Sequence, residues 1–183
     1  MLPASTCQLL ALRRPAETAL ANAKLLVILI KSPLDRFSAI ESQLLRVLAI
    51  SGSLRRRSTN AAALAALARL APEGVRVLLY QDLAKLPPFN PDDDPEDGPV
   101  PQPVENFRAV GASDAIVIAA PEYAHGLPGT FKNALDWVVV SETFAGKRVA
   151  LINASPRAFH AQADLREILA IMAARFIASL QEA

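Results

Sequence analysis

Cysteine and histidine are scarce in this sequence of 183 residues, which contains one cysteine, Cys7, and two histidines, His125 and His160. A single cysteine excludes an internal disulfide and a metal site built from several cysteines. Two histidines are too few for a histidine-rich zinc or di-iron centre, and we expect no metal site. Charge of one sign is also lacking, because 19 basic residues balance 18 acidic ones. This balance disfavours a protein that coats nucleic acid or an anionic membrane.

Long apolar runs and targeting signals are lacking too. The longest unbroken apolar run, residues 61–68, is far short of the roughly 18 residues that a membrane-spanning helix needs. A polar segment separates the basic pair Arg13 and Arg14 from the short apolar run 25–30, unlike a secretory signal. Acidic residues at positions 17, 35 and 41 disfavour a transit peptide. We therefore expect a cytoplasmic protein that does not bind membranes.

The sequence does contain enough apolar residues, 52%, to build one α/β domain with a sizeable core. Residues 1–45 show no clear hydrophobic period, and we interpret them as an N-terminal extension, either an accessory segment or a lengthened start. The domain itself is expected over residues 46–183. Within it, the segment 86–103 contains seven prolines and an acidic run, which preclude a continuous helix or strand. We interpret this segment as a solvated loop, with a mobile lid or subunit-contact arm as the alternative.

Strand and helix patterns alternate along the domain. Helices are expected after a cap at Ser58 to Asn60, after a cap at Thr130, and around Leu165. Buried strands are expected over 47–50, 75–80, 114–120, 147–153 and 175–180. This alternation predicts a parallel sheet with helices on both faces. Ligands bind such sheets beyond the carboxyl ends of the strands, so we expect the site just after residues 50, 120 and 153.

The turn after the first strand, residues 51–60, has the groups that a phosphate needs. Gly52 permits a tight turn, serine hydroxyls and a helix N-terminus supply donors, and Arg55 adds a positive charge. The nucleoside-triphosphate P-loop and the dinucleotide glycine motif are both absent. Two alternatives stay open, namely a capped helix preceded by a solvated basic turn, and a nucleic-acid contact through the three consecutive arginines.

The loop after the third strand, residues 121–129, has proline near both ends and glycine between them. Such a loop can present backbone groups to a flat heterocycle while Tyr123 packs nearby. These motifs, taken in order, resemble the NADPH-dependent FMN reductase family, the flavodoxin-like group of quinone, chromate and azo-dye reductases. The resemblance covers about residues 46–180 and is carried by Ser51–Arg55 with Ser58 and Asn60, Pro121–Tyr123, Pro128–Gly129 and Lys132–Trp137.

The resemblance implies an α/β flavodoxin-like three-layer sandwich with a five-stranded parallel sheet in the order 2-1-3-4-5. It places non-covalent FMN where the first and third strands diverge. The positions matched to the FMN phosphate and ribityl end are Ser51, Ser53, Leu54, Arg55, Ser58 and Asn60. The positions matched to the isoalloxazine ring are Pro121, Glu122, Tyr123 and Gly126 in one loop and Ser155 in the next.

The resemblance also implies an activity. NADPH or NADH would deliver hydride to flavin N5, and the flavin would then reduce a quinone, a flavin or a similar small acceptor in a ping-pong cycle. No side chain need act as a nucleophile, and for Glu122 we favour a structural role over that of a general base. Homodimers or homotetramers are implied. The alternatives are a flavodoxin-like FMN-binding or interaction module without turnover and an electron carrier of flavodoxin type.

Two departures from the family pattern affect these expectations. Ala158 and Phe159 stand where relatives often have glycines, so Phe159 is expected to crowd the flavin or to stack on it. The chain also ends at Ala183, where relatives usually continue into a final helix. We expect the apolar run 25–30 to pack where that helix would lie.

Overall fold

The described part of the chain, in a computed structural model, comprises residues 44–139, 141, 143–155 and 158–181. Here five parallel strands form one sheet in the order β2-β1-β3-β4-β5, which confirms the predicted topology. The strands are β1 (Leu45–Ser51), β2 (Val75–Tyr80), β3 (Ala115–Ala119), β4 (Arg148–Asn153) and β5 (Arg175–Gln181). The winding direction reverses between β1 and β3, which pair directly with each other.

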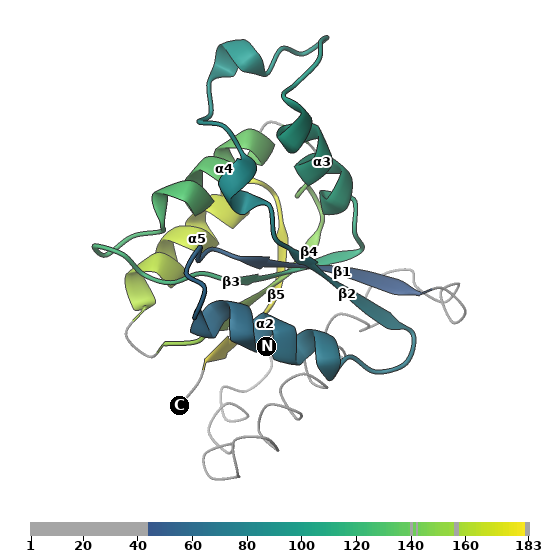
Figure 1. The fold of residues 1–183 in the computed structure, drawn as a ribbon, viewed down its shortest axis with the longest axis vertical. Helices are drawn as coiled ribbons and strands as arrows, with labels where there is room; N and C mark the ends of the chain where they lie inside the picture. The colour runs from purple at the N-terminus through teal and green to yellow at the C-terminus, as the bar shows by residue number, and fades with distance from the viewer. Residues whose placement is uncertain (1–43, 140, 142, 156–157, 182–183) are drawn as a thin grey trace, which may run out of the picture.

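The helices cover both faces of the sheet and make a three-layer molecule (Figure 1). One face carries α2 (Thr59–Arg69), and the opposite face carries α3 (Gln102–Gly111), α4 (Gly129–Val139) and α5 (Phe159–Ile171). The expected cap of the first of these helices is confirmed, because the Ser58 hydroxyl accepts a hydrogen bond from the Ala61 N–H at 3.2 Å. The helix then ends before Pro72, as the sequence predicts.

Alternate residues of each strand supply two separate cores. Leu48 and Ile118 pack in the cluster that also contains Phe131 of α4, whereas Val47 and Val117 pack in the cluster of α2. All five residues of β3 are buried, as expected for a central parallel strand covered on both faces. The sheet is thus a rigid platform whose carboxyl edge carries the loops discussed below.

Two expectations about helices were wrong. Helix α4 begins at Gly129, where the Pro128 carbonyl accepts hydrogen bonds from the N–H groups of Phe131 and Lys132, both at 2.9 Å. Thr130 therefore lies inside the exposed first turn and is not the cap. Helix α3 was not predicted at all, although it buries an apolar stripe, because the surrounding prolines obscured its start.

The proline-rich segment is exposed over most of residues 91–99, as expected, but its start is bound to α4. Asn133 accepts a hydrogen bond from the Phe89 N–H at 2.7 Å, and its amide donates to the Pro87 carbonyl at 2.9 Å. The Trp137 indole donates to that same carbonyl at 2.8 Å. Figure 1 shows the segment projecting beyond α3 and α4, away from the sheet. It is consequently an anchored arm rather than a free loop.

Residues 1–43 lie outside the described part, and with them the expected packing of the run 25–30. Strand β1 begins at Leu45, one residue before the expected start of the domain. Among the residues that the structure describes, no helix has both the length and the apolar character needed to cross a membrane.

Candidate functional site

Three loops leave the sheet at the same edge, as expected from the parallel topology. Ser51, at the end of β1, pairs with Ala119 of β3, and Ala119 pairs in turn with Ile152 of β4. The following loops begin at these positions. The Gly52 N–H continues the ladder by donating to the Ala119 carbonyl at 2.9 Å. The first loop is therefore fixed against β3 before it turns toward α2.

Gly52 is required by close packing. A Cβ atom at this position would lie 3.0 Å from the Ala120 Cβ and 3.1 Å from the Phe131 ring. Both neighbours are buried and have no room to move away. Glycine thus lets the first turn sit directly on β3 and α4.

The hydroxyls of the first turn brace its own backbone. The Ser51 hydroxyl accepts a hydrogen bond from the Ser53 N–H at 3.3 Å, and the Ser53 hydroxyl accepts one from the Arg55 N–H at 3.4 Å. Ser58 is engaged in capping α2. Leu54 and Arg55 are exposed, and Asn60 is buried in the first turn of α2. The turn has a defined shape and directs its cationic group outward.

This turn fits a phosphate group. Residues 51–60 contain no acidic side chain, and the N-terminus of α2 provides unpaired N–H groups and a partial positive charge. Hydroxyl groups and a guanidinium complete a set of donors suited to phosphate oxygens. The residues predicted to bind phosphate thus lie on one turn that is free of acidic side chains.

The second loop contains a tight two-residue turn. Tyr123 and Gly126 exchange N–H···O hydrogen bonds of 3.0 and 3.1 Å. The two residues between them have positive φ angles, 50° at Ala124 and 62° at His125. Side chains disfavour this left-handed region. The turn holds Tyr123, 49% exposed, at the surface.

Glu122 connects the second loop to the start of α5. One carboxylate oxygen accepts hydrogen bonds from the N–H groups of His160, at 2.8 Å, and Ala161, at 3.1 Å. Ala158, the residue at the N-cap position, makes no side-chain cap. Glu122 therefore supplies the helix cap from 38 residues away. This contact favours the predicted structural role over a general base.

The third loop follows β4. Buried Asn153 accepts a hydrogen bond from the Ser155 N–H at 3.2 Å, which turns the chain away from the sheet. Beyond it, Phe159 is 61% exposed and lies 5.1 Å from the His160 ring, measured between centroids. Because Phe159 is exposed, its position is compatible with either expected effect, crowding the flavin or stacking on it.

His160 also stacks on His125, with ring centroids 4.4 Å apart and an angle of 22° between planes. The scarcity of histidine gave no reason to expect this pair. Its only sequence signal is that each histidine follows the carboxyl end of one of two strands, β3 and β4, that turn out to be neighbours. The sheet order was needed to bring them together.

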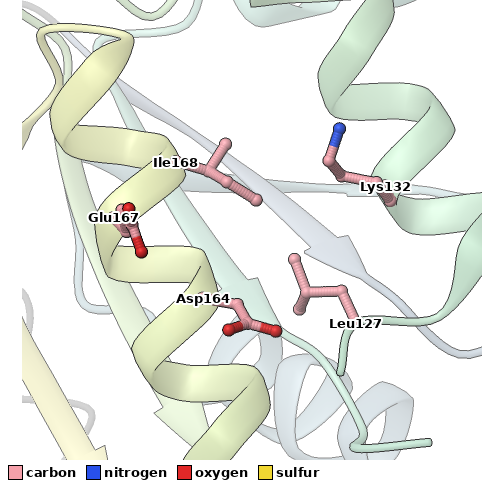
Figure 2. Close-up of a pocket in the computed structure, with 5 residues that line it drawn as sticks. All are labelled: Leu127, Lys132, Asp164, Glu167 and Ile168. Carbon is pink, nitrogen blue, oxygen red and sulfur yellow. The ribbon is translucent and has the colours of Figure 1, made fainter. Parts of the chain in front are cut away.

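Two pockets lie beside α4, and their described linings include the end of the second loop, at Leu127 in one and Gly129 in the other. One, of about 320 Å³, lies between α4 and α5 (Figure 2), where Leu127, Lys132, Asp164, Glu167 and Ile168 line it. The other, of about 280 Å³, is beside the start of α4, where its lining includes Leu86, Gly129 and Asn133. Neither set of described lining residues contains a predicted flavin-binding residue. The candidate site is consequently the loop-lined edge of the sheet, because that is where the phosphate-binding chemistry lies.

Tyr80 ends β2 beside Ile50, next to the first turn. Its hydroxyl is buried without a hydrogen-bond partner in the described structure. Burial, and secondarily the negative charge of Asp82, raises the pKa of Tyr80 from 10.0 to about 12. Tyr80 thus stays neutral at physiological pH and contributes packing against Phe107, 4.8 Å away between ring centroids.

Comparison with known proteins agrees with the geometry. The family described as NADPH-dependent FMN reductase matches residues 45–182. The chain is 38% identical over 134 residues to an NAD(P)H-dependent FMN reductase of Pseudomonas aeruginosa, covering 70% of this chain and 71% of that protein. It is 32% identical over 137 residues to a quinone reductase of Escherichia coli, covering 72% of each.

A solved structure shows the same arrangement. FerB, a flavoenzyme NAD(P)H:(acceptor) oxidoreductase from Paracoccus denitrificans, is 28% identical and superimposes with a TM-score of 0.58, covering 76% of this chain and 75% of its own. The residues that the family model matches, 45–182, include all five strands and the three loops at their carboxyl edge. With its predicted sheet order and its phosphate-fitting turn, the chain belongs to the NADPH-dependent FMN reductase family.

Proposed function

We propose that this chain is an FMN-dependent NAD(P)H oxidoreductase that reduces a quinone, a flavin or a similar small acceptor. The observation that carries the proposal is the turn 51–60, which is free of acidic residues, rich in donors, and placed where the sheet reverses its winding direction. The names of the relatives, an FMN reductase and a quinone reductase, support the choice of acceptors. When bound, FMN supplies the transfer of electrons from NAD(P)H to the acceptor, in the ping-pong order that we propose.

In this proposal the first turn binds the phosphate and ribityl end. Ser53 and the exposed Arg55 offer side-chain donors, and the N-terminus of α2 adds backbone N–H groups and partial positive charge. The Ser51 hydroxyl donates to the Ser53 carbonyl at 3.4 Å and would exchange that bond for a phosphate oxygen. Ser58 acts indirectly, because its hydroxyl holds the first turn of α2 in place. The remaining proposed contacts at this end are Leu54 and Asn60.

The second and third loops bind the ring. Pro121, Glu122, Tyr123 and Gly126 border it, mainly through backbone groups, and Ser155 approaches from the third loop. The carboxylate of Glu122 keeps the wall of the site in shape, because it ties the second loop to α5. The chain therefore binds and orients the cofactor and leaves redox chemistry to it.

Replacing Arg55 by alanine tests the proposal. A lost hydrogen bond between charged groups is worth about 1.5–3 kcal/mol, so the Kd for FMN should rise roughly 10- to 100-fold. FMN fluorescence quenching on titration of flavin-free protein measures it. The matched control is Arg57→Ala, an equally exposed arginine of the same turn, which should change Kd little. Equal losses in both variants would reject a specific phosphate contact and leave only general electrostatic attraction.

Turnover separates the enzyme from the alternatives. The purified protein should be yellow and should oxidise NADPH or NADH in the presence of a quinone. A yellow protein without this activity would instead be an FMN-binding module, or an electron carrier if it accepts electrons from a separate reductase. A colourless protein that does not bind added FMN would contradict the enzyme and the electron carrier and would support an interaction module without a cofactor.

We also propose that the protein is a cytoplasmic homodimer or homotetramer. Exposed apolar side chains near the candidate site support an interface there, namely Tyr123 and Phe159, which are 49% and 61% exposed. Sedimentation equilibrium distinguishes these assemblies from a monomer, and cell fractionation tests the location. A monomer at micromolar concentration would contradict the proposed assembly.

We propose further that residues 1–45 form a separate extension whose run 25–30 covers an apolar face of the sheet. Because β1 already begins at Leu45, the deletion that tests this removes residues 1–43 and leaves the strand complete. The truncated protein should melt at a lower temperature or lose solubility. An equally soluble and stable truncation would show that the extension has no such structural role.

A further inference from the structure

Three side chains with metal-binding groups meet where the second loop joins α5. Glu122, His125 and His160 each offer a ligand atom, and these atoms all lie within 4.8 Å of one another. We infer that they form a binding site for one divalent transition-metal ion, for which Zn²⁺ is the best match. Imidazole nitrogen and carboxylate oxygen are both ordinary zinc ligands, and two histidines with one glutamate leave a fourth position open. The inference does not depend on FMN.

The spacing is within reach of tetrahedral coordination. Ligand atoms about 2.1 Å from zinc lie about 3.4 Å apart in a tetrahedron, so ligand atoms now up to 4.8 Å apart must approach by up to about 1.4 Å. Both histidines are exposed, which leaves their rings free to rotate. The two rings are now stacked, 4.4 Å between centroids with 22° between their planes. Binding one ion requires them to leave this stack and turn until one nitrogen of each points to the same place.

The backbone holds the ligands in place. His125 lies at a φ of 62°, in a turn where both central residues have positive φ and neither is glycine. Glycine or asparagine is usual in such turns. The strain is offset by the two Tyr123–Gly126 hydrogen bonds that fix the turn. An outlying backbone conformation that carries a metal-ligating side chain is consistent with a binding role.

Glu122 has capacity for a metal as well as for the helix cap. A carboxylate has about four lone-pair positions, of which the two α5 N–H groups occupy two. The N–H of His160 is one of these donors, so the glutamate also fixes the backbone of a second ligand. The partial positive charge at the start of α5 opposes a cation, and the negative charge of Glu122 offsets it.

Bound metal would join the second loop to α5 by coordinate bonds, in addition to the hydrogen bonds already there. The joined elements form one wall of the proposed flavin site. The ion is therefore expected to stiffen that wall, with no part in the redox step. The scarcity of histidine led to the expectation of no metal site, but the fold places both histidines beside one carboxylate.

Isothermal titration calorimetry of the full-length, tag-free protein with ZnCl₂ tests the inference. We expect one Zn²⁺ per chain with a micromolar or lower Kd. The variants His125→Gln and His160→Gln should each raise that Kd at least about tenfold. Asp164→Asn is the matched control. Asp164 is an exposed carboxylate close to the turn, since its Oδ2 lies 3.6 Å from the position that a Cβ on Gly126 would take. It is not one of the three proposed ligands. It should leave the Kd within about twofold.

Two further measurements keep the outcome clear. Cys7→Ser should bind zinc as the wild type does, since the site lies elsewhere. Electron paramagnetic resonance of the Cu²⁺-loaded protein should show coupling to two imidazole nitrogens, reduced to one in either histidine variant. Absence of saturable zinc binding, binding that both histidine variants retain, or an equal loss in Asp164→Asn would overturn the inference. Circular dichroism would verify that each variant is folded.

Discussion

The first and second loops at the carboxyl edge of the sheet are built by opposite means. In the turn 51–60, the side-chain hydrogen bonds join residues two or three positions apart. In the loop 121–129, the carboxylate of Glu122 reaches 38 residues along the chain to α5. The side chains of the first turn brace only their own segment, and the turn rests on β3 and α4 through the backbone of Gly52. In the second loop a side chain makes the distant contact, so this loop and the start of α5 form one unit. The predictions that follow test this difference, from the largest expected effect to the smallest.

The first prediction concerns the glycines of the two loops. Gly52→Ala should lower the free energy of unfolding by about 1–3 kcal/mol, because the added methyl group collides with buried Ala120 and Phe131. Gly129→Ala, where a Cβ would meet nothing within 4 Å, should leave stability unchanged or raise it by up to about 1 kcal/mol. Urea denaturation measures both. Similar values for the two variants would mean that the first turn is not tightly seated on β3.

The second prediction concerns Tyr80, the buried neighbour of the first turn. Its pKa of about 12 lies above the usual 10.0, so the folded state holds the phenolic proton more tightly than the unfolded state does. The associated stability is present below pH 10 and is lost as the pH rises from 10 to 12. Because the Tyr80 side chain is only partly buried, solvent screening limits this contribution to roughly 1–2 kcal/mol.

The matched test of that prediction is Tyr80→Phe, which removes both the titration and a hydroxyl that has no partner. The variant should equal or exceed wild-type stability at neutral pH and should lose less stability between pH 10 and 12. Tyr123→Phe, at an exposed tyrosine of the second loop, should behave as the wild type does. If the free energy of unfolding of wild type and of Tyr80→Phe fell equally between pH 10 and 12, the raised pKa of Tyr80 would be disproved.

The third prediction tests the long-range contact of the second loop. Glu122→Ala should lower the free energy of unfolding by about 1 kcal/mol, because α5 loses its N-terminal cap. Glu122→Gln should lose less, since the amide oxygen still accepts hydrogen bonds. The control Glu167→Ala, at an exposed site on α5, should remain within about 0.5 kcal/mol of wild type. Hydrogen exchange at the start of α5 should accelerate in Glu122→Ala alone. Unchanged exchange would refute the coupling.

The smallest effect is expected at the tight turn of the second loop. Ala124 has a φ of 50°, which glycine adopts more easily. Ala124→Gly should therefore raise the free energy of unfolding by about 0.5 kcal/mol. The relief of backbone strain stabilises the folded state, and the greater conformational entropy of glycine in the unfolded chain cancels part of that gain. Ala124→Val should lower it, because branched side chains fit this region poorly. A loss in Ala124→Gly measured by urea denaturation would show that the turn is not strained.

Much of the fold could be predicted because its signals are local. Apolar runs identified the strands, and Ser58 identified the start of α2, since a cap depends on residues three positions apart. Thr130 has the same chemistry, yet the helix begins one residue earlier at Gly129, after Pro128. Helix α3 was missed although Val104 and Phe107 are buried at helical spacing, because prolines dominate the sequence around its first turn.

The sequence alone determined the strand-and-helix alternation, the donor-rich turn at Ser51 and the family to which these motifs point. Each depends on neighbouring residues, whose relative positions follow from backbone geometry. The tertiary structure decided which distant groups meet, namely Glu122 with the N-terminus of α5 and His125 with His160. Sheet order and helix packing bring these residues together. The hydrophobic pattern of each segment reports only on its own secondary structure and does not indicate which distant residue it will meet.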